Sequence, residues 1–119
     1  MTDESRKQKG LALAKQLFEG SKGSTKLPAA LSAYTIEHLF GDVWQQQNLT
    51  LQERSIATCT MLVALNREAE QHLHFLGAKN LGVAREKLEA IITHAAHYAG
   101  WPCAASASRV LNEVWPVEE

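Results

Sequence analysis

The segment Thr50–Leu65, TLQERSIATCTMLVAL, decides the fold of this chain. Its first four residues match a capping box, in which a threonine hydroxyl and a glutamate carboxylate satisfy free amides at a helix start. We therefore expect a helix that begins at Leu51. From Ile56 onward the residues are apolar or small on every side, which is typical of a helix that other elements surround. The segment predicts the central helix of a helical bundle.

The rest of the chain is also predicted to be helical. Its three prolines, at 28, 102 and 116, stand where a helix begins or has ended. Gly82 and Gly100 stand where a helix is expected to end. No strand is required, because the few β-branched residues fall inside helical periods. The fold class is therefore all-α, a compact bundle of about six helices, expected over residues 4–19, 28–40, 51–65, 68–81, 85–99 and 102–115.

Two of the expected helices have a clear apolar face. The first carries Leu11, Ala14, Leu17 and Phe18 on one side, and the fifth carries Leu88, Ile91, Ile92, Ala95 and Ala99 at helical spacing.

We expect one domain over residues 1–119. Residues 1–27 form its N-terminal helix and linker, and residues 28–115 form its core.

Composition excludes several classes of protein. Of the 119 residues, 45% are hydrophobic and 21% are charged, as in ordinary globular proteins. Twelve basic and thirteen acidic residues leave no basic excess that would bind nucleic acid. No apolar run approaches the roughly 20 residues of a membrane-spanning helix, and the start MTDESRKQKG lacks a signal-peptide core. We expect a cytoplasmic protein that binds neither nucleic acid nor membranes.

The two cysteines do not suggest a redox or metal centre. Cys59 and Cys103 form no C-x-x-C motif and show no metal-ligand spacing with histidine. Both lie among small or apolar neighbours, which is typical of a buried, inert thiol. The cysteines therefore predict neither a disulfide framework nor a structural metal site.

The segment REAEQHLHFLGAKNLG, residues 67–82, gathers groups that can carry chemistry. At 100° per residue, Arg67, Glu70 and His74 share one wall of the fourth helix. His72 points away from them, so the two histidines do not form a chelating pair. Glu70 and His74 have the spacing of an acid/base dyad beside a small cavity. The same spacing fits an ordinary surface pair worth a few tenths of a kcal/mol, and both interpretations stay open.

A further histidine, His94, lies at the edge of the core face of the fifth helix, one turn before Tyr98. Either a direct role in a site or a structural role fits this position. His97 points away from that face. His38 and His72 are expected at the surface or at an interface.

Four ordered segments carry a resemblance to a known family: FGDVW (40–44), LTLQERSIAT (49–58), HLHFLGAKNLGV (72–83) and HYAGWPCAAS (97–106). Together they resemble the carboxymuconolactone decarboxylase family of the alkylhydroperoxidase D-like superfamily, over roughly residues 30–114. The resemblance implies an all-α fold whose subunits form homo-oligomers, commonly a hexamer built as a trimer of dimers. An oligomer would also cover apolar and aromatic residues that short helices leave exposed.

The resemblance separates two branches of that superfamily. The peroxidase branch uses a C-x-x-C pair four residues before a histidine, and a glutamate on an earlier helix. Here the histidine matches His74, but Arg67 and Glu70 stand at the cysteine positions and Ser55 at the glutamate position. A dithiol that attacks a peroxide is therefore missing. The decarboxylase branch, which also lacks the cysteines, is the better match.

That branch implies loss of CO₂ from γ-carboxymuconolactone in the β-ketoadipate pathway of aromatic catabolism, without a cofactor. The departing CO₂ leaves an electron pair conjugated into the lactone ring, and a proton completes the product. Such a site needs a group that binds carboxylates and a group that delivers a proton. The resemblance assigns the first task to Arg54 and Arg67, and the second to His74 with Glu70. Trp44, Tyr98 and Trp101 are expected to wall the cavity and keep water out. His94, from its position on the fifth helix, is a further expected substrate-binding residue.

Other interpretations are left open by the sequence. The aromatic residues are equally suited to packing in a core or an interface. A thiol-dependent antioxidant protein would require Cys59 and Cys103 to meet in the fold. A third possibility is an oligomeric binding or scaffold protein, in which Glu70 and His74 are only a surface pair.

Overall fold

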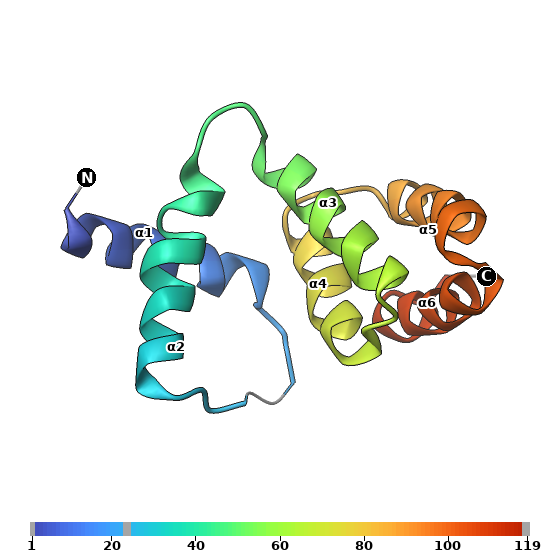
Figure 1. Ribbon diagram of the computed structural model, residues 1–119, viewed down its shortest axis with the longest axis horizontal. Helices are drawn as coiled ribbons and strands as arrows, with labels where there is room; N and C mark the ends of the chain where they lie inside the picture. Colours follow the sequence, from blue (N-terminus) through green and yellow to red (C-terminus); the bar gives the residue numbers. More distant parts are fainter. Residues whose placement is uncertain (1, 23–24, 118–119) are drawn as a thin grey trace.

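The computed structural model describes residues 2–22 and 25–117. Within these ranges every regular element is a helix, so the predicted all-α class is confirmed. Figure 1 shows α1 and α2 at one end of the molecule and α3 to α6 at the other. The elements in chain order are α1 (Asp3–Leu17), α2 (Ala29–Ala33), η1 (Tyr34–Phe40), η2 (Val43–Gln45), α3 (Leu51–Ala64), α4 (Glu68–Asn80), α5 (Arg85–Ala99) and α6 (Trp101–Val114).

The predicted helix ends agree closely with the structure. At the start of α3 the Glu53 amide donates to the Thr50 hydroxyl over 3.0 Å, and the Glu53 carboxylate accepts from the Thr50 amide over 2.8 Å. Gly82 and Gly100 have φ of 86° and 110°, which side-chain-bearing residues rarely adopt. Capping chemistry therefore fixes these boundaries locally, independently of tertiary packing.

The predicted helix 28–40 is continuous in extent but changes its winding. It begins as the α-helix α2 after Pro28 and continues as η1, a seven-residue π-helix. Where η1 crosses α1, a Cβ atom added to Gly10 would lie 1.9 Å from the Ile36 carbonyl oxygen. One added to Gly41 would lie 2.2 Å from the Arg6 carbonyl oxygen. The two helices therefore approach each other through glycine backbone.

The interior consists of two hydrophobic clusters. The C-terminal core packs α3 to α6 together around Cys59, Val63, Phe75, Leu88 and Leu111. The N-terminal core joins α1, η1 and η2 to the end of α4 around Leu13, Leu17, Phe40, Trp44 and Leu81. Because α4 contributes to both clusters, it is the element that connects the two halves of the molecule.

Two expectations about burial are wrong. Elements do not surround α3: it packs on α4, α5 and α6, and on its remaining side Met61 and Leu65 are 62% and 66% exposed. On α1 the buried residues are Gly10, Leu13 and Leu17, whereas Leu11 is 49% exposed. In both cases the single chain supplies fewer neighbours than the apolar content of the helix suggested.

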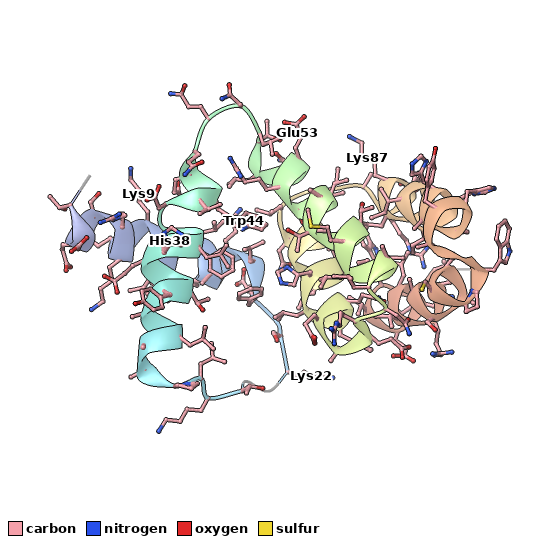
Figure 2. The ribbon with its side chains drawn as sticks, in the orientation of Figure 1. Lys9, Lys22, His38, Trp44, Glu53 and Lys87 are labelled. Carbon is pink, nitrogen blue, oxygen red and sulfur yellow. The ribbon has the colours of Figure 1, made fainter. Side chains whose placement is uncertain are left out.

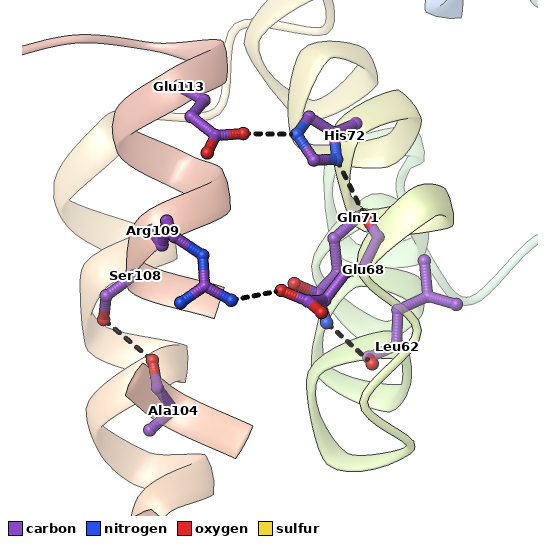
Figure 3. A network of polar contacts seen from close by, with 8 residues as sticks. All are labelled: Leu62, Glu68, Gln71, His72, Ala104, Ser108, Arg109 and Glu113. Carbon is purple, nitrogen blue, oxygen red and sulfur yellow. Dashed lines mark hydrogen bonds and ion pairs between the residues drawn. The ribbon is translucent and has the colours of Figure 1, made fainter. Parts of the chain in front are cut away.

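A polar network connects α4 to α6 on the outside of the C-terminal core (Figure 3). His72 Nε2 lies 2.7 Å from a Glu113 carboxylate oxygen, and Arg109 donates to the Glu68 carboxylate over 2.7 Å. Beneath them the buried Gln71 amide donates to the Leu62 carbonyl of α3 over 3.0 Å. The orientation of α4 is therefore fixed from both neighbouring helices.

A membrane-spanning segment is not found among the helices of residues 2–22 and 25–117, since none has the necessary length and apolar character.

Candidate functional site

His74 lies on α4 at the junction of the two cores. Its ring meets the Phe18 ring edge to face, with centroids 5.8 Å apart, and Phe18 packs against the N-terminal core. Its backbone carbonyl accepts a weak hydrogen bond from the Cys59 thiol of the C-terminal core over 3.4 Å. The predicted proton donor is therefore held between two apolar clusters rather than in open solvent.

The two ring nitrogens of His74 have different surroundings. Nδ1 is buried and has no hydrogen-bond partner, whereas Nε2 is not enclosed in this way. Burial lowers the pKa of His74 because a charged ring loses hydration, and the negative charge of Glu70 opposes that effect. A proton on this ring is consequently held less tightly than on an ordinary histidine, and Nε2 is the nitrogen positioned to exchange it.

Glu70 acts on His74 only from a distance. Its side chain is exposed, and over the described residues no hydrogen bond or ion pair joins it to the His74 ring. The carboxylate therefore contributes a favourable charge for the imidazolium without fixing the orientation of the ring. Orientation comes instead from the packing of Phe18.

Arg54 stands on the first turn of α3 and faces the connection after η2. One of its terminal amino groups donates to the Gln46 carbonyl over 3.0 Å, while its Nε is buried without a partner. A buried donor of this kind has hydrogen-bonding capacity available for an anion. Arg67 is exposed and stands at the N-cap of α4, one residue before the helix begins.

A row of aromatic rings leads from Trp44 toward His74. The Trp44 ring lies 5.7 Å from Phe40, and Phe40 lies 5.7 Å from Phe18. Figure 2 shows Trp44 on the stretch that connects the N-terminal helices with α3. Trp44 is buried and contacts Phe40, which in turn contacts the Phe18 ring beside His74.

The structure places the other predicted contact residues in two separate pairs of rings where α5 ends and α6 begins. His94 stacks on Tyr98 with ring centroids 4.8 Å apart, where α5 ends, and Trp101 meets His97 at the start of α6. Tyr98 and Trp101 are 82% and 65% exposed. Among the described residues of the single chain, no aromatic contact or hydrogen bond joins this cluster to His74.

The cysteines remain apart. Cys59 is buried, and burial raises the pKa of its thiol to about 12. Cys103 is half-buried at the start of α6, and its thiol makes a long contact of 3.9 Å to the Ala64 carbonyl. Both are free thiols, so the prediction of a buried, unreactive Cys59 is confirmed and the bridge required by the antioxidant alternative is not formed. No metal-binding group of three or more His, Cys, Asp or Glu side chains occurs over residues 2–22 and 25–117.

Two surface hollows lie on the N-terminal half, away from the predicted site. The larger, about 660 Å³, is bordered by Lys7, Leu11, Lys26, Leu27, Ile36 and Glu37. The smaller, about 420 Å³, lies beside Arg6, Tyr34 and His38. Neither is lined by a residue predicted for the site.

The sequence did not identify the residues that build the surroundings of His74. Phe18 and Phe40 were expected only as helix residues, and the contact between Phe18 and His74 joins the two ends of a long stretch of chain. Asn80 of α4, which donates to two carbonyls of the α1 end, was also missed. Asn80 lies in the segment AKNLG, which is part of the family resemblance. That resemblance was the available signal, but it does not indicate which residues Asn80 contacts.

Comparison with known proteins relates this chain to decarboxylases. The profile of the Carboxymuconolactone decarboxylase family matches residues 29–113. The 4-carboxymuconolactone decarboxylase of Acinetobacter baylyi is 30% identical over 122 residues, which cover 97% of this chain and 90% of that protein. The nitrosuccinic acid decarboxylase of Metarhizium robertsii is 32% identical over 77 residues, 65% of this chain and 54% of that protein.

By its sequence, the helical bundle is thus similar to two proteins named as decarboxylases. The chain belongs to the Carboxymuconolactone decarboxylase family.

Proposed function

We propose that this protein is a cofactor-independent decarboxylase of a small, activated carboxylic acid. The observation that carries the proposal is the position of His74, whose Nδ1 is enclosed and whose Nε2 is left open beside Phe18. Family membership and two relatives named as decarboxylases support the same class of reaction.

The proposed substrate is a lactone carboxylic acid of the 4-carboxymuconolactone type, as in the β-ketoadipate pathway of aromatic catabolism. The bond between the carboxylate carbon and the ring breaks, CO₂ leaves, and the electron pair is delocalised into the unsaturated lactone. Nitrosuccinic acid, the compound in the name of the second relative, has a nitro group that can accept an electron pair in the same way. We therefore define the substrate class as acids whose leaving carboxylate stands next to such an acceptor.

In this mechanism the imidazolium of His74 delivers a proton from Nε2 to carbon. Because burial lowers the pKa of His74, the imidazolium is a stronger acid than an ordinary histidine. Glu70 keeps part of the population protonated through its charge. Arg54, with its unpartnered Nε, and Arg67 bind the carboxylates, and the buried Trp44 helps to exclude water.

The test measures CO₂ release and loss of lactone absorbance with γ-carboxymuconolactone, and CO₂ release with nitrosuccinate as a second substrate. We expect turnover by the unmodified protein and a loss of at least about 100-fold in His74→Ala, the usual minimum contribution of a positioned acid. His38→Ala is the matched control, since His38 is an exposed histidine on η1. Full activity in His74→Ala, or no turnover of either substrate, would contradict the proposal.

We also propose that the protein functions as a homo-oligomer, in line with the hexamer that the family resemblance implies. Exposed apolar and aromatic side chains support an assembly, since monomers rarely leave so many uncovered: Tyr34, Met61, Leu65, Tyr98 and Trp101. In an assembly the His94, Tyr98 and Trp101 cluster could contribute to the site of another copy. Light scattering coupled to size-exclusion chromatography measures the mass, and a purely monomeric species would refute this part.

A further inference from the structure

The end of α1 rests directly on α4, one turn beyond His74. Gly77 leaves room for Leu17: a Cβ atom at Gly77 would lie 3.2 Å from Leu17 Cδ2. Three residues later on the same face of α4, the Asn80 amide nitrogen donates to the carbonyls of Leu17 and Glu19, each over 2.9 Å. Both hydrogens of one side-chain amide are therefore used on the same turn of backbone.

Those two carbonyls flank Phe18, the residue that covers His74. Phe18 is the C-cap of α1, and its own amide still donates to the Ala14 carbonyl over 3.0 Å. The carbonyls at a helix end lack helical partners, so a side chain that donates hydrogen bonds to them holds the last turn in place. Here that side chain comes from the helix that carries His74.

We propose that Asn80 is a positioning residue for His74: by gripping the backbone on both sides of Phe18, it fixes the phenyl ring against the imidazole. The proposal deepens the function proposed above, because it names the residue that sets the surroundings of the proton donor. Asn80 acts through Phe18 and is not itself a catalytic residue.

A consequence for proton affinity follows from this arrangement. The closeness of Phe18 helps to exclude water from the His74 ring, and exclusion of water is the main cause of its lowered pKa. When the α1 end is released, the ring regains hydration and the pKa of His74 rises toward the ordinary histidine value.

The test titrates the His74 ring by NMR in the full-length protein and in Asn80→Ala, Phe18→Ala and the double variant. We expect the pKa of His74 to rise in both single variants. The double variant should match Phe18→Ala, because Asn80 acts through that ring. Asn112→Ala is the matched control: it removes another tertiary amide contact, the 2.6 Å hydrogen bond from Arg85, and should leave the titration of His74 unchanged.

Two results would overturn the proposal. One is a folded Asn80→Ala whose His74 titrates as in the unmodified protein. The other is a pKa shift in the double variant equal to the sum of both single shifts. If Asn80→Ala does not fold, NMR of the unmodified protein provides the test. The proposal is refuted if nuclear Overhauser contacts between Phe18 and His74 are missing. It is also refuted if the side-chain amide protons of Asn80 are not protected from exchange with solvent.

Activity is measured separately, so that the two proposals can fail independently. A raised pKa of His74 without turnover of either substrate would keep the positioning role and reject the decarboxylase. If turnover exists, its decline at high pH should move to higher pH in Asn80→Ala, together with the pKa of His74. Turnover whose pH profile does not change would count against the role of Asn80.

Discussion

Two histidines on α4, only two residues apart, have opposite environments. His72 faces α6, where Nε2 lies 2.7 Å from the Glu113 carboxylate and Nδ1 lies 3.0 Å from the Glu68 carbonyl. The hydrogen bond with Glu113 raises the pKa of His72. His74 faces the end of α1, and burial there lowers its pKa.

This difference shows that tertiary contacts, rather than position in the sequence, determine the direction in which the pKa of each imidazole is shifted. Two residues along a helix correspond to a turn of about 200°, so each ring belongs to a different interface. The hydrogen bond with the Glu113 carboxylate favours the protonated form of the His72 ring, which raises its pKa. One helix thus holds two imidazoles on different faces, one with a raised pKa and one with a lowered pKa.

The largest expected effect concerns the exclusion of water from the region around Cys59, whose thiol contacts the His74 backbone. With a thiol pKa of about 12, Cys59 should react with a disulfide reagent at neutral pH about 10³-fold more slowly than an ordinary thiol. Absorbance should show one fast equivalent from Cys103, and a second only after unfolding in guanidinium. Two fast equivalents in the folded protein would mean that water reaches this side of α4.

The next effect tests the packing of α4, the helix that carries both histidines. Phe75 is fully buried between α4 and its neighbours, so Phe75→Ala should lower the free energy of unfolding by about 3–5 kcal/mol. Urea denaturation measures the loss. The exposed Lys87→Ala on α5 is the control and should change stability by less than about 0.5 kcal/mol. A small loss in Phe75→Ala would show that α4 is held by other contacts.

The pair of His72 and Glu113 should give a modest pH dependence of stability. Because the folded pKa of His72 is raised, its contribution is fully present below the unfolded pKa and is lost as pH rises through the folded pKa. Both side chains are partly exposed, which limits the contribution to less than about 1 kcal/mol.

Thermal unfolding at pH 5.5 and 8.5 provides the measurement. The difference in melting temperature between the unmodified protein and Glu113→Gln should shrink at the higher pH. Glu86→Gln, a change of an exposed carboxylate on α5, serves as the control. A difference that stays constant with pH would show that His72 is neutral in the folded state.

The smallest effect is expected from Glu70→Gln. Removing this carboxylate takes away the charge that supports the imidazolium, so the pKa of His74 should fall further. NMR titration of the ring detects the shift. A rise in the pKa would indicate that Glu70 does not face His74 in solution, and it would remove the carboxylate from the proposed mechanism.

Much of the fold could be predicted because its signals are local. The Thr50 capping box and the glycines at 82 and 100 determine helix ends through nearby atoms alone. The π-winding of η1 gave no such signal, because apolar spacing in so short a segment does not distinguish it from an α-helix. The exposure of Met61 and Leu65 was missed because composition shows that a helix is apolar, but not whether the chain has elements to cover it.

The candidate site divides in the same way. Helical spacing predicted Glu70 near His74, and the charge of Glu70 does act on the pKa of His74, whereas Arg67 stands at the N-cap outside the helix. The contact with Phe18 and the grip of Asn80 depend on how α1 docks on α4, which no residue spacing reports. Tyr98 and Trp101 were grouped with His74 by resemblance and His94 by its position on the fifth helix, and their contribution to the site remains a prediction that concerns neighbouring copies.

The glycine contact between α1 and η1 has a consequence for protein engineering. Replacing helical glycine by alanine is a common route to thermostability, but at Gly10 and Gly41 the new methyl group would meet carbonyl oxygens of the opposite backbone. In a saturation mutagenesis library these two positions, one inside α1 and one at the C-cap of η1, should be depleted together of every other amino acid.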